Sequence, residues 1–403
     1  MVEILKKFTI LKLNRQLKHF RYVIFQKHQH FKMRFSIFII LLIHSSCFFG
    51  QSEDKTIVTP QKTNYTTEVV VPDLQIPWGM TWLPDGSMLI IEIKGKLIHF
   101  KDGKKTEITD CPEVVARGQG GFLDVELHPD YKNNGWIYFT YSSPEGTEKG
   151  SNTALMRAKL KNGALIEKQV LYKGSPNTTR GHHFGSRIVF DDAGYVYFTI
   201  GDRGEHFVNP QDVSKDGGKV YRLKDDGTIP TDNPFYNTAN AKQAIYSYGH
   251  RNQQGMAIHP DTRQIWTNEH GPQGGDEINI ISKGKNYGWP VITYGINYDN
   301  TIITEKKNME GMEQPLYYYI PSIAPSGMAF INSDTYPGWK GSLLIGSLRF
   351  QYLERLEIKN NKVTYREKLI PDMGRVRNVK MGPDGFIYAG VENKGIVKII
   401  PIK

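Results

Sequence analysis

The sequence predicts an all-β fold, a six-bladed β-propeller, because one turn-and-strand pattern occurs six times along the chain. In each copy a turn built on Asp leads into a burst of apolar residues, as in Pro84-Asp85-Gly86 before Met88–Ile91. The Asp residues of the six copies are Asp85, Asp130, Asp192, Asp261, Asp334 and Asp384, which lie 45 to 73 residues apart. One copy would indicate an ordinary hairpin. Six copies, at or above the ~40–45 residues that a blade needs, predict a ring of blades with inserted loops.

The composition fits this fold and excludes one class of partner. The chain holds 39 Gly, 22 Tyr and 19 Phe, which suits many short strands and tight turns, and it has no helical periodicity. Its net charge of +10 comes mainly from residues 1–34, which hold nine Lys or Arg and one Glu. The rest of the chain is nearly neutral, so the charge does not support a nucleic-acid partner.

Residues 1–50 are predicted to be an N-terminal extension and signal segment, with Met33 as a candidate start. Met33-Arg34 precedes the apolar run Phe35–Ile43, which is too short to span a bilayer comfortably. We therefore expect an exported protein, periplasmic or secreted. Three alternatives stay open at this segment: lipid anchoring through Cys47, simple cleavage near Gly50-Gln51, and an uncleaved anchor.

The body of the chain is predicted to be one domain. Residues 51–65 are polar and read as a linker, and residues 66–403 form the propeller. The alternating segment Thr66–Val71 is expected to close the ring by pairing with Lys394–Ile400 in the last blade. Only Cys111 remains in this body, so it has no internal disulfide.

Polar loops at the edges of the predicted strands are the candidates for a functional site. Two long irregular stretches, 203–243 and 268–315, depart from the blade pattern, and loops of such length are usually functional. The loops richest in polar groups are 117–121, 182–187, 201–204, 249–253, 268–277, 348–349 and 375–378. Their Arg residues would form a cationic pocket, and Arg clusters bind carboxylates through bidentate forks. The pattern predicts a small polyanionic ligand.

Several segments, taken together and in order, resemble one known family over roughly residues 66–400. They are 76–79, 118–123, 183–187, 199–203, 217–219, 233–235, 248–255, 269–279, 285–290 and 325–330. The chain resembles the soluble quinoprotein glucose dehydrogenases, specifically the aldose sugar dehydrogenase branch, which uses pyrroloquinoline quinone (PQQ). The resemblance implies oxidation of an aldose at C1 to a lactone, with Ca²⁺ and an external electron acceptor.

The resemblance implies three catalytic residues. His183 matches the base that takes the proton of the anomeric hydroxyl, a role that suits an imidazole. Asp202 matches the carboxylate that orients this base, and Gln119 matches a polar contact near base and cofactor. Taken alone, Asp202-Arg203-Gly204 would indicate a turn, and the neighbouring His182 has no counterpart in the family.

The resemblance also implies a set of cofactor-binding residues, namely Gln119, Arg251, Asn252, Ser322, Arg349, Arg375 and Arg377. The alternate spacing of Arg375 and Arg377 places both on one face of a strand, although Arg-x-Arg alone would fit a solvated strand face. Arg349 stands where relatives usually have Lys, so a planar fork replaces a compact charge. Ser322 matches a hydroxyl contact that only some relatives have.

The metal ligands implied by the resemblance form two calcium sites. Gly271 and Pro272 match backbone carbonyls that hold Ca²⁺ at the cofactor, and hard Ca²⁺ prefers oxygen ligands. Glu277 and Tyr287 match a second, structural calcium site. Without the family, the adjacent acidic residues Asp276 and Glu277 would indicate a solvated loop.

A six-bladed propeller is also compatible with two functions other than aldose oxidation. A propeller that only binds a sugar or another ligand would retain the scaffold without the chemistry, since fold does not fix function. A metal-dependent lactonase would need several convergent carboxylate or His ligands, whereas this chain offers His183 and many Arg. The sequence leaves monomer and homodimer open.

Overall fold

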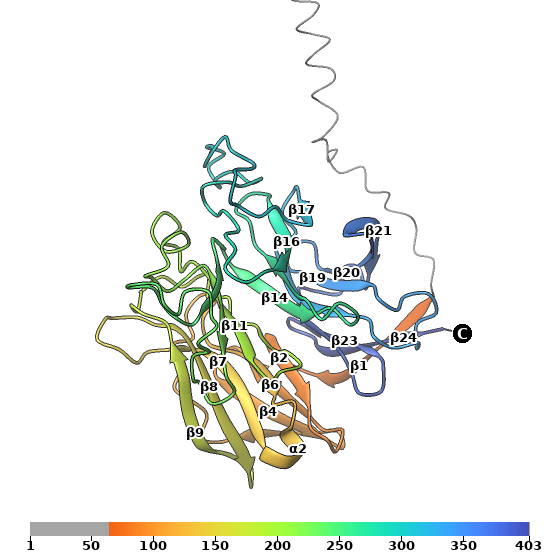
Figure 1. Cartoon of the computed structure of the whole chain (residues 1–403). Helices are drawn as coiled ribbons and strands as arrows, with labels where there is room; N and C mark the ends of the chain where they lie inside the picture. Colours follow the sequence, from red (N-terminus) through yellow and green to blue (C-terminus); the bar gives the residue numbers. More distant parts are fainter. Residues whose placement is uncertain (1–63, 403) are drawn as a thin grey trace, which may run out of the picture. The chain divides into compact units, whose positions relative to one another are not determined.

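The structure is a computed structural model that describes residues 64–402. The signal segment at 1–50, with its cleavage and anchoring alternatives, and the linker up to residue 63 lie outside the described residues. Within 64–402 the only helix is the single turn α2(Tyr131–Asn134), and no helix there could cross a membrane. The remaining elements are strands in six four-stranded antiparallel sheets, which confirms the predicted six-bladed propeller (Figure 1).

Each sheet is one blade, and its strands follow one another along the chain. Blade one contains β2(Pro77–Trp82), β3(Met88–Glu92), β4(Lys96–Lys101) and β5(Lys104–Ile108). Blade two contains β6(Phe122–Leu127), β7(Trp136–Ser143), β8(Asn152–Lys161) and β9(Ala164–Lys173). Blade three contains β10(Ile188–Phe190), β11(Val196–Ile200), β12(Lys219–Leu223) and β13(Ile245–Tyr248).

The second half of the chain repeats this order. Blade four contains β14(Gln253–Ile258), β15(Ile265–Glu269), β16(Asp276–Ile281) and β17(Tyr317–Tyr319). Blade five contains β18(Pro325–Phe330), β19(Leu343–Ser347), β20(Tyr352–Lys359) and β21(Lys362–Leu369). Blade six contains β22(Val376–Met381), β23(Ile387–Val391), β24(Gly395–Pro401) and, from the start of the chain, β1(Tyr65–Pro72).

The ring is closed by the pairing that the sequence predicted. Strand β1 pairs antiparallel with β24, and Thr66 lies opposite Ile400. The strand begins at Tyr65, one residue before the expected start. The innermost strands β2, β6, β10, β14, β18 and β22 each contact the next one, and β22 contacts β2. This ring of contacts fixes the order of the blades around the axis.

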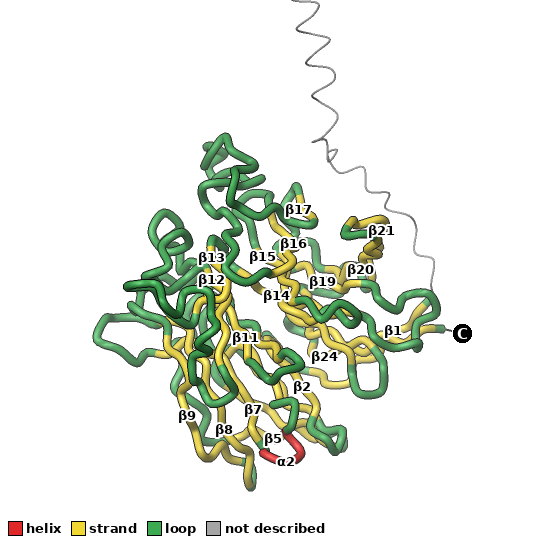
Figure 2. The backbone as a smooth tube through the Cα atoms, viewed as in Figure 1, coloured by secondary structure: helices red, strands yellow, loops and turns green. Residues whose placement is uncertain are grey.

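The six Asp turns occupy equivalent positions, because each joins the innermost strand of a blade to the second strand. Asp85 lies between β2 and β3, and Asp384 lies between β22 and β23. Helix α2 follows Asp130 in the corresponding turn of blade two. Figure 2 shows α2 and β17 at opposite ends of this part of the chain. The insertion 201–218 lies at the end opposite to α2, whereas the insertion 224–244 begins at the α2 end, where Asp225 Oδ2 lies 3.7 Å from His128 Nε2.

The two long irregular stretches are only partly irregular. Strand β12 falls within residues 203–243, and β16 falls within 268–315. The prediction missed β12 because Lys219 and Arg222 interrupt its apolar pattern, although both side chains are buried. The remaining insertions are the loops 201–218, 224–244 and 282–316.

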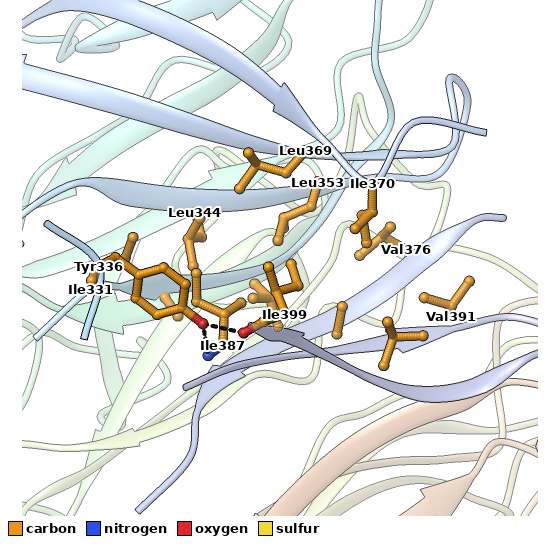
Figure 3. Packing of buried hydrophobic residues seen from close by; sticks show 14 of the residues in the cluster. Ile331, Tyr336, Leu344, Leu353, Leu369, Ile370, Val376, Ile387, Val391 and Ile399 are labelled. Atoms are coloured by element: carbon orange, nitrogen blue, oxygen red, sulfur yellow. Dashed lines mark hydrogen bonds between the residues drawn. The ribbon is translucent and has the colours of Figure 1, made fainter. Parts of the chain in front are cut away.

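Both faces of most strands are buried, since each blade packs between two neighbours. Between blades five and six, Leu344, Leu353, Val376 and Ile387 form part of one apolar cluster (Figure 3). Tyr336 completes this cluster, because its hydroxyl donates to the Ile399 carbonyl and accepts from the Ile387 N–H. The core therefore consists of interblade layers rather than one central mass.

A buried arginine connects five of the six blades near the axis. Arg187 Nε donates to the Gln254 carbonyl at 2.6 Å, and Nη2 donates to the Arg377 carbonyl at 3.0 Å. Its Nη1 lies 3.2 Å from both the Trp78 carbonyl and Asp124 Oδ1. Because the charge is paired with Asp124 and every contact is a hydrogen bond, burial of the guanidinium is compensated. Arg187 thus fixes the inner strands that carry the site.

Candidate functional site

The predicted site residues gather at one end of the ring, opposite to the Asp turns. In an antiparallel blade, residues just before the first strand and just after the second strand lie at the same end. Gln119, His183, Arg251, Asn252, Ser322 and Arg375 precede first strands, whereas Asp202, Gly271, Pro272 and Arg349 follow second strands. Arg377 lies near the start of β22 and Glu277 near the start of β16. The topology alone brings loops of blades two to six to this end.

His183 and Asp202 form a hydrogen-bonded pair at the centre of these loops. His183 Nδ1 lies 2.6 Å from Asp202 Oδ1. The Asp202 side chain has no exposed surface, and 13% of the His183 side chain is exposed. An ionised carboxylate only accepts hydrogen bonds, so Nδ1 carries the proton and Nε2 keeps a free lone pair. This is the tautomer that a proton acceptor at Nε2 requires.

The electrostatics of the pair keep the imidazole neutral and the carboxylate ionised. Burial, reinforced by the positive charge of Arg251, lowers the pKa of His183 to about 4 against the opposing effect of Asp202. Burial alone would raise the pKa of Asp202, but His183, Arg251 and the Gly204 N–H lower it to about 2. At neutral pH the pair is therefore a neutral base held by an anion.

Neighbouring loops hold His183 in an uncommon backbone conformation. Its φ of 58° lies in the left-handed region, which costs a non-glycine residue free energy. Gln119 Oε1 accepts the His183 N–H at 2.8 Å, so the predicted contact between Gln119 and the base is present. Gly118 makes this approach possible: a Cβ there would lie 2.1 Å from the Gly181 carbonyl oxygen. Strain held in this way is typical of functional loops.

Two further groups hold Asp202, and one of them is a residue that sequence reasoning missed. Trp289 Nε1 donates to Oδ2 at 2.9 Å, and the Gly204 N–H donates to Oδ1 at 2.7 Å. The Asp202 N–H donates to the Arg251 carbonyl at 2.7 Å. Trp289 lies in the family-like segment 285–290, which was the available signal for it. Residues 202–205 do form a turn, in which the Glu205 N–H donates to the Asp202 carbonyl at 3.1 Å, and the Asp202 carboxylate is in addition buried and fully engaged.

Four arginines lie at this end of the ring, and we call them the cationic wall: Arg251, Arg349, Arg375 and Arg377, of which Arg251 acts directly on the His183–Asp202 pair. Arg251 is buried, and its Nη1 donates to the carbonyls of His270 at 3.0 Å and Gly271 at 2.8 Å. Arg377 is 11% exposed, Arg375 is 46% exposed, and Arg349 is exposed, with Nη1 3.4 Å from the Ser322 carbonyl. The exposed fraction of these side chains therefore differs, from the buried Arg251 to the exposed Arg375 and Arg349.

Glu392 is the anionic partner of this wall, and no motif in the sequence pointed to it. Its Oε2 accepts from Arg375 Nε at 2.8 Å, and its Oε1 accepts from Arg377 Nε at 3.0 Å. Both arginines therefore point to the same side, as their spacing predicted, and the solvated-face interpretation is wrong for Arg377. One carboxylate for two guanidinium groups leaves a net positive charge there.

Asn252 and Ser322 differ in how far their polar groups are already engaged. Asn252 is fully buried; its Oδ1 accepts the Gly185 N–H at 3.1 Å, and its Nδ2 has no partner. Ser322 donates its hydroxyl to Asp276 Oδ1 at 2.9 Å. Asn252 therefore has a donor to offer to a ligand, whereas the hydroxyl proton of Ser322 is already used.

Asp276 shapes the loop that carries Gly271 and Pro272. Its Oδ1 accepts the Gly271 N–H at 2.8 Å, and its Oδ2 accepts the N–H groups of Ile323 at 2.7 Å and Ala324 at 3.0 Å. Burial raises the pKa of Asp276 to about 6. The solvated-loop interpretation of this acidic stretch is wrong, because Asp276 is fully buried at the start of β16.

Glu277 and Tyr287, the residues implied for the second calcium site, contact different neighbours. Asn279 Nδ2 donates to Glu277 Oε2 and to Glu269 Oε1, both at 3.0 Å. The Tyr287 N–H donates to the Tyr248 carbonyl at 2.9 Å. Within residues 64–402 no three His, Cys, Asp or Glu side chains form a metal-binding group.

The comparisons with known proteins agree with this geometry. The family described as glucose/sorbosone dehydrogenase matches residues 74–398. Aldose sugar dehydrogenase YliI of Escherichia coli (strain K12) is 40% identical over 344 residues, covering 83% of this chain and 92% of that protein. The apo-form crystal structure of the soluble E. coli aldose sugar dehydrogenase has a TM-score of 0.81 and 39% identity, covering 84% of this chain and all of that one.

A cofactor-bound structure is also similar. The PQQ-bound aldose sugar dehydrogenase of Streptomyces coelicolor has a TM-score of 0.70 and 26% identity, and the match covers 85% of this chain and 100% of that one. The family match includes strands of all six blades and every loop that carries a predicted site residue. The chain therefore belongs to the glucose/sorbosone dehydrogenase family.

Proposed function

We propose that this protein is a PQQ- and calcium-dependent aldose dehydrogenase that oxidises the sugar at C1 to the lactone and passes the electrons to an external acceptor. The observation that carries the proposal is the His183–Asp202 pair, with a neutral imidazole whose Nε2 is free, beside a wall of arginines. The PQQ-dependent sugar oxidation of the family supports the same chemistry.

The residues at the site fit PQQ, a planar quinone that carries three carboxylates. Arg251, Arg375, Arg377 and Arg349 offer the charge that such an anion needs. The unpartnered Nδ2 of Asn252 is a buried donor that a bound acceptor atom would satisfy. When bound, PQQ supplies the two-electron acceptor for the hydride of C1. Glu392 accepts hydrogen bonds from both Arg375 and Arg377, and so holds these two side chains in place before the cofactor binds.

The base chemistry follows from the His183–Asp202 pair. His183 Nε2 takes the proton of the anomeric hydroxyl as the hydride leaves C1, so the sugar loses two electrons and two hydrogens and becomes the lactone. Asp202 stabilises the imidazolium that forms and keeps the ring in the required orientation. Gln119 holds the backbone of His183 by accepting its N–H. A noncatalytic binding propeller would not need this buried pair.

Calcium is proposed at two places. The carbonyls of Gly271 and Pro272 would hold one ion at the cofactor, and the Gly271 oxygen, which accepts from Arg251, keeps a second lone pair for it. Glu277 and the Tyr287 carbonyl would hold the second ion. Burial and the neighbouring Glu269 raise the pKa of Glu277, and a cation at Glu277 would offset both effects.

The pH dependence of the reaction is expected to follow His183. Only the neutral imidazole accepts a proton, so kcat/KM should fall as the pH decreases through about 4 and should be constant above about pH 5. The parameter kcat/KM is used because it reports the pKa of His183 in the enzyme before sugar binds. Initial rates at low sugar concentration from pH 3.5 to 8 test this, and an acidic limb near pH 6.5 would contradict the assigned environment.

Removal of calcium is expected to abolish activity and to lower the melting temperature. One ion serves the cofactor, and the other ties Glu277 in β16 to the loop that carries Tyr287, so both bind only the folded state. Melting curves and turnover with PQQ are measured before and after chelation by EDTA, and again after Ca²⁺ is restored. An EDTA-treated protein with an unchanged melting temperature and unchanged turnover would refute the calcium sites.

The proposed function is tested by reconstitution. Apo-protein receives PQQ and Ca²⁺ and is assayed for dye reduction with a panel of aldoses and, as a negative control, with the corresponding C1-reduced alditols. Aldoses should be oxidised and the alditols should not. PQQ binding without oxidation of any aldose would favour the binding-only propeller.

A further inference from the structure

Glu269, at the end of β15, binds groups from the loop 249–252 and from β16. It is 4% exposed, and its Oε2 accepts the backbone N–H of Arg251 at 2.6 Å. Its Oε1 accepts from His250 Nδ1 at 2.9 Å and from Asn279 Nδ2 at 3.0 Å. Both carboxylate oxygens are therefore committed, and the position of Glu269 fixes the backbone that carries Arg251.

The Glu269 carboxylate also accepts from one neighbour of each residue proposed to bind the second calcium ion. These neighbours are Asn279, which contacts Glu277, and His250, which contacts Tyr287. The Asn279 amide donates to Glu269 and to Glu277 at 3.0 Å each, so one Nδ2 joins the two carboxylates. The His250 ring, which donates to Glu269, stacks on the Tyr287 ring with centroids 4.4 Å apart. Movement of Glu277 or Tyr287 therefore reaches Glu269 through a single intervening side chain.

On its other side, Glu269 leads directly to the cofactor site. Arg251, held by Glu269 through its N–H, donates from Nη1 to the Gly271 carbonyl at 2.8 Å. The Arg251 carbonyl accepts the Asp202 N–H at 2.7 Å. Arg251 thus connects Glu269 with the proposed calcium ligand Gly271 through its side chain, and with Asp202 through its carbonyl.

Four buried polar atoms in the cluster around Glu269 have no hydrogen-bond partner within residues 64–402. In the register of blade four, Glu269 lies opposite Gln253 and Glu277, and Thr267 lies opposite Asn279, which places all five on one face. Thr267 Oγ1, Asn279 Oδ1 and both amide atoms of Gln253 are buried without a hydrogen-bond partner. Two close carboxylates and unused oxygens need a cation to be fully compensated.

We infer that Glu269 is a positioning residue that couples the cation site at Glu277 to the affinity of the cofactor site, through the backbone of Arg251. This inference rests on the proposed function, since it concerns PQQ and calcium. A cation bound by Glu277 and the Tyr287 carbonyl fixes the side chains next to them, Asn279 and His250, which both donate to Glu269, and so keeps Glu269 in the position that holds Arg251. Linkage then requires that PQQ tighten cation binding by the same factor.

The test is a double-mutant cycle that measures PQQ affinity, not activity. PQQ is titrated into Ca²⁺-saturated protein and binding is followed by quenching of tryptophan fluorescence. The variants are Glu277→Gln, Glu269→Gln and the double variant. Glu277→Gln should weaken PQQ binding about tenfold, within the ~5–150-fold range of such couplings. In the Glu269→Gln background the same change should have little further effect, because the connection is already broken.

Two further variants keep the result decisive. Glu313→Gln removes an exposed carboxylate that pairs with Lys285 near Tyr287, and it should leave PQQ affinity unchanged. If Glu269→Gln does not fold, Asn279→Ala replaces it, because it cuts the direct bridge between the two carboxylates and should reduce the effect of Glu277→Gln. Additive effects, or an unchanged affinity in Glu277→Gln, overturn the coupling alone. Failure of the wild-type protein to bind PQQ overturns the proposed function and the coupling with it.

Discussion

Replacement of His183 by alanine is expected to lower kcat by at least about 10²-fold, the lower scale for the loss of a general base. The variant removes the imidazole that Asp202 holds with Nε2 free, and burial keeps this imidazole neutral by lowering the pKa of His183 to about 4. PQQ binding should change far less, because Arg251, Arg375 and Arg377 provide the charge for the cofactor. Both quantities are measured, as kcat with several aldoses and as a PQQ titration.

The adjacent histidine is the control for this variant. The His182 ring packs edge-on against His183 with centroids 4.6 Å apart, but its side chain makes no contact with Asp202 among the hydrogen bonds of residues 64–402. His182→Ala should therefore be mild. A His182→Ala variant that is inactive, or a His183→Ala variant with normal turnover, would show that the base is assigned wrongly.

Replacement of Asp202 by asparagine is expected to lower kcat by about 10⁴-fold, the scale known for the buried Asp of a histidine-containing triad. Both carboxylate oxygens accept hydrogen bonds: Oδ1 from His183 and Gly204, and Oδ2 from Trp289. Asparagine must place an NH₂ group against one of these donors. It then either loses Trp289 or forces the proton of His183 onto Nε2, where the base must be free.

Asp212→Asn is a matched control in the same loop. The Asp212 carboxylate accepts from the Ser214 N–H at 2.8 Å and from its hydroxyl at 2.6 Å, away from the base. This variant should keep a kcat near that of the wild-type protein. Melting curves of both variants separate loss of chemistry from loss of fold. An Asp202→Asn variant that is folded and fully active would remove the tautomer argument.

The fold was predictable because its signals are local. Each Asp turn lies in one hairpin, and six hairpins in sequence define six blades without knowledge of any long-range contact. Closure of the ring by Thr66–Val71 was predictable for the same reason, since an unpaired alternating segment at one terminus needs a partner at the other. Strand β12 was missed because its two buried cationic residues are compensated only in three dimensions.

The candidate site was predictable only where a motif carried it. His183, Asp202 and Gln119 lie in segments that resemble the family, and the structure brings them into contact. Glu392 lies in no such segment and could not be found in this way. Glu269 begins the family-like segment 269–279, but its contacts with Arg251 and His250 come from a loop about 18 residues away and were not visible in the sequence. The interval from Arg375 to Glu392 spans a whole hairpin, and only the blade geometry returns Glu392 to the two arginines.

The central claim is that His183 serves a hydride transfer from C1 of an aldose, and a single-turnover experiment tests it most directly. PQQ- and Ca²⁺-loaded protein is mixed, without any electron acceptor, with glucose that carries hydrogen or deuterium at C1, and reduction of the cofactor is followed by absorbance. The wild-type protein should reduce one equivalent of cofactor, more slowly with deuterium, and His183→Ala should bind PQQ but reduce it at least about 10²-fold more slowly. Reduction at the wild-type rate in His183→Ala, or no sugar-dependent reduction in the loaded wild-type protein, would contradict the account.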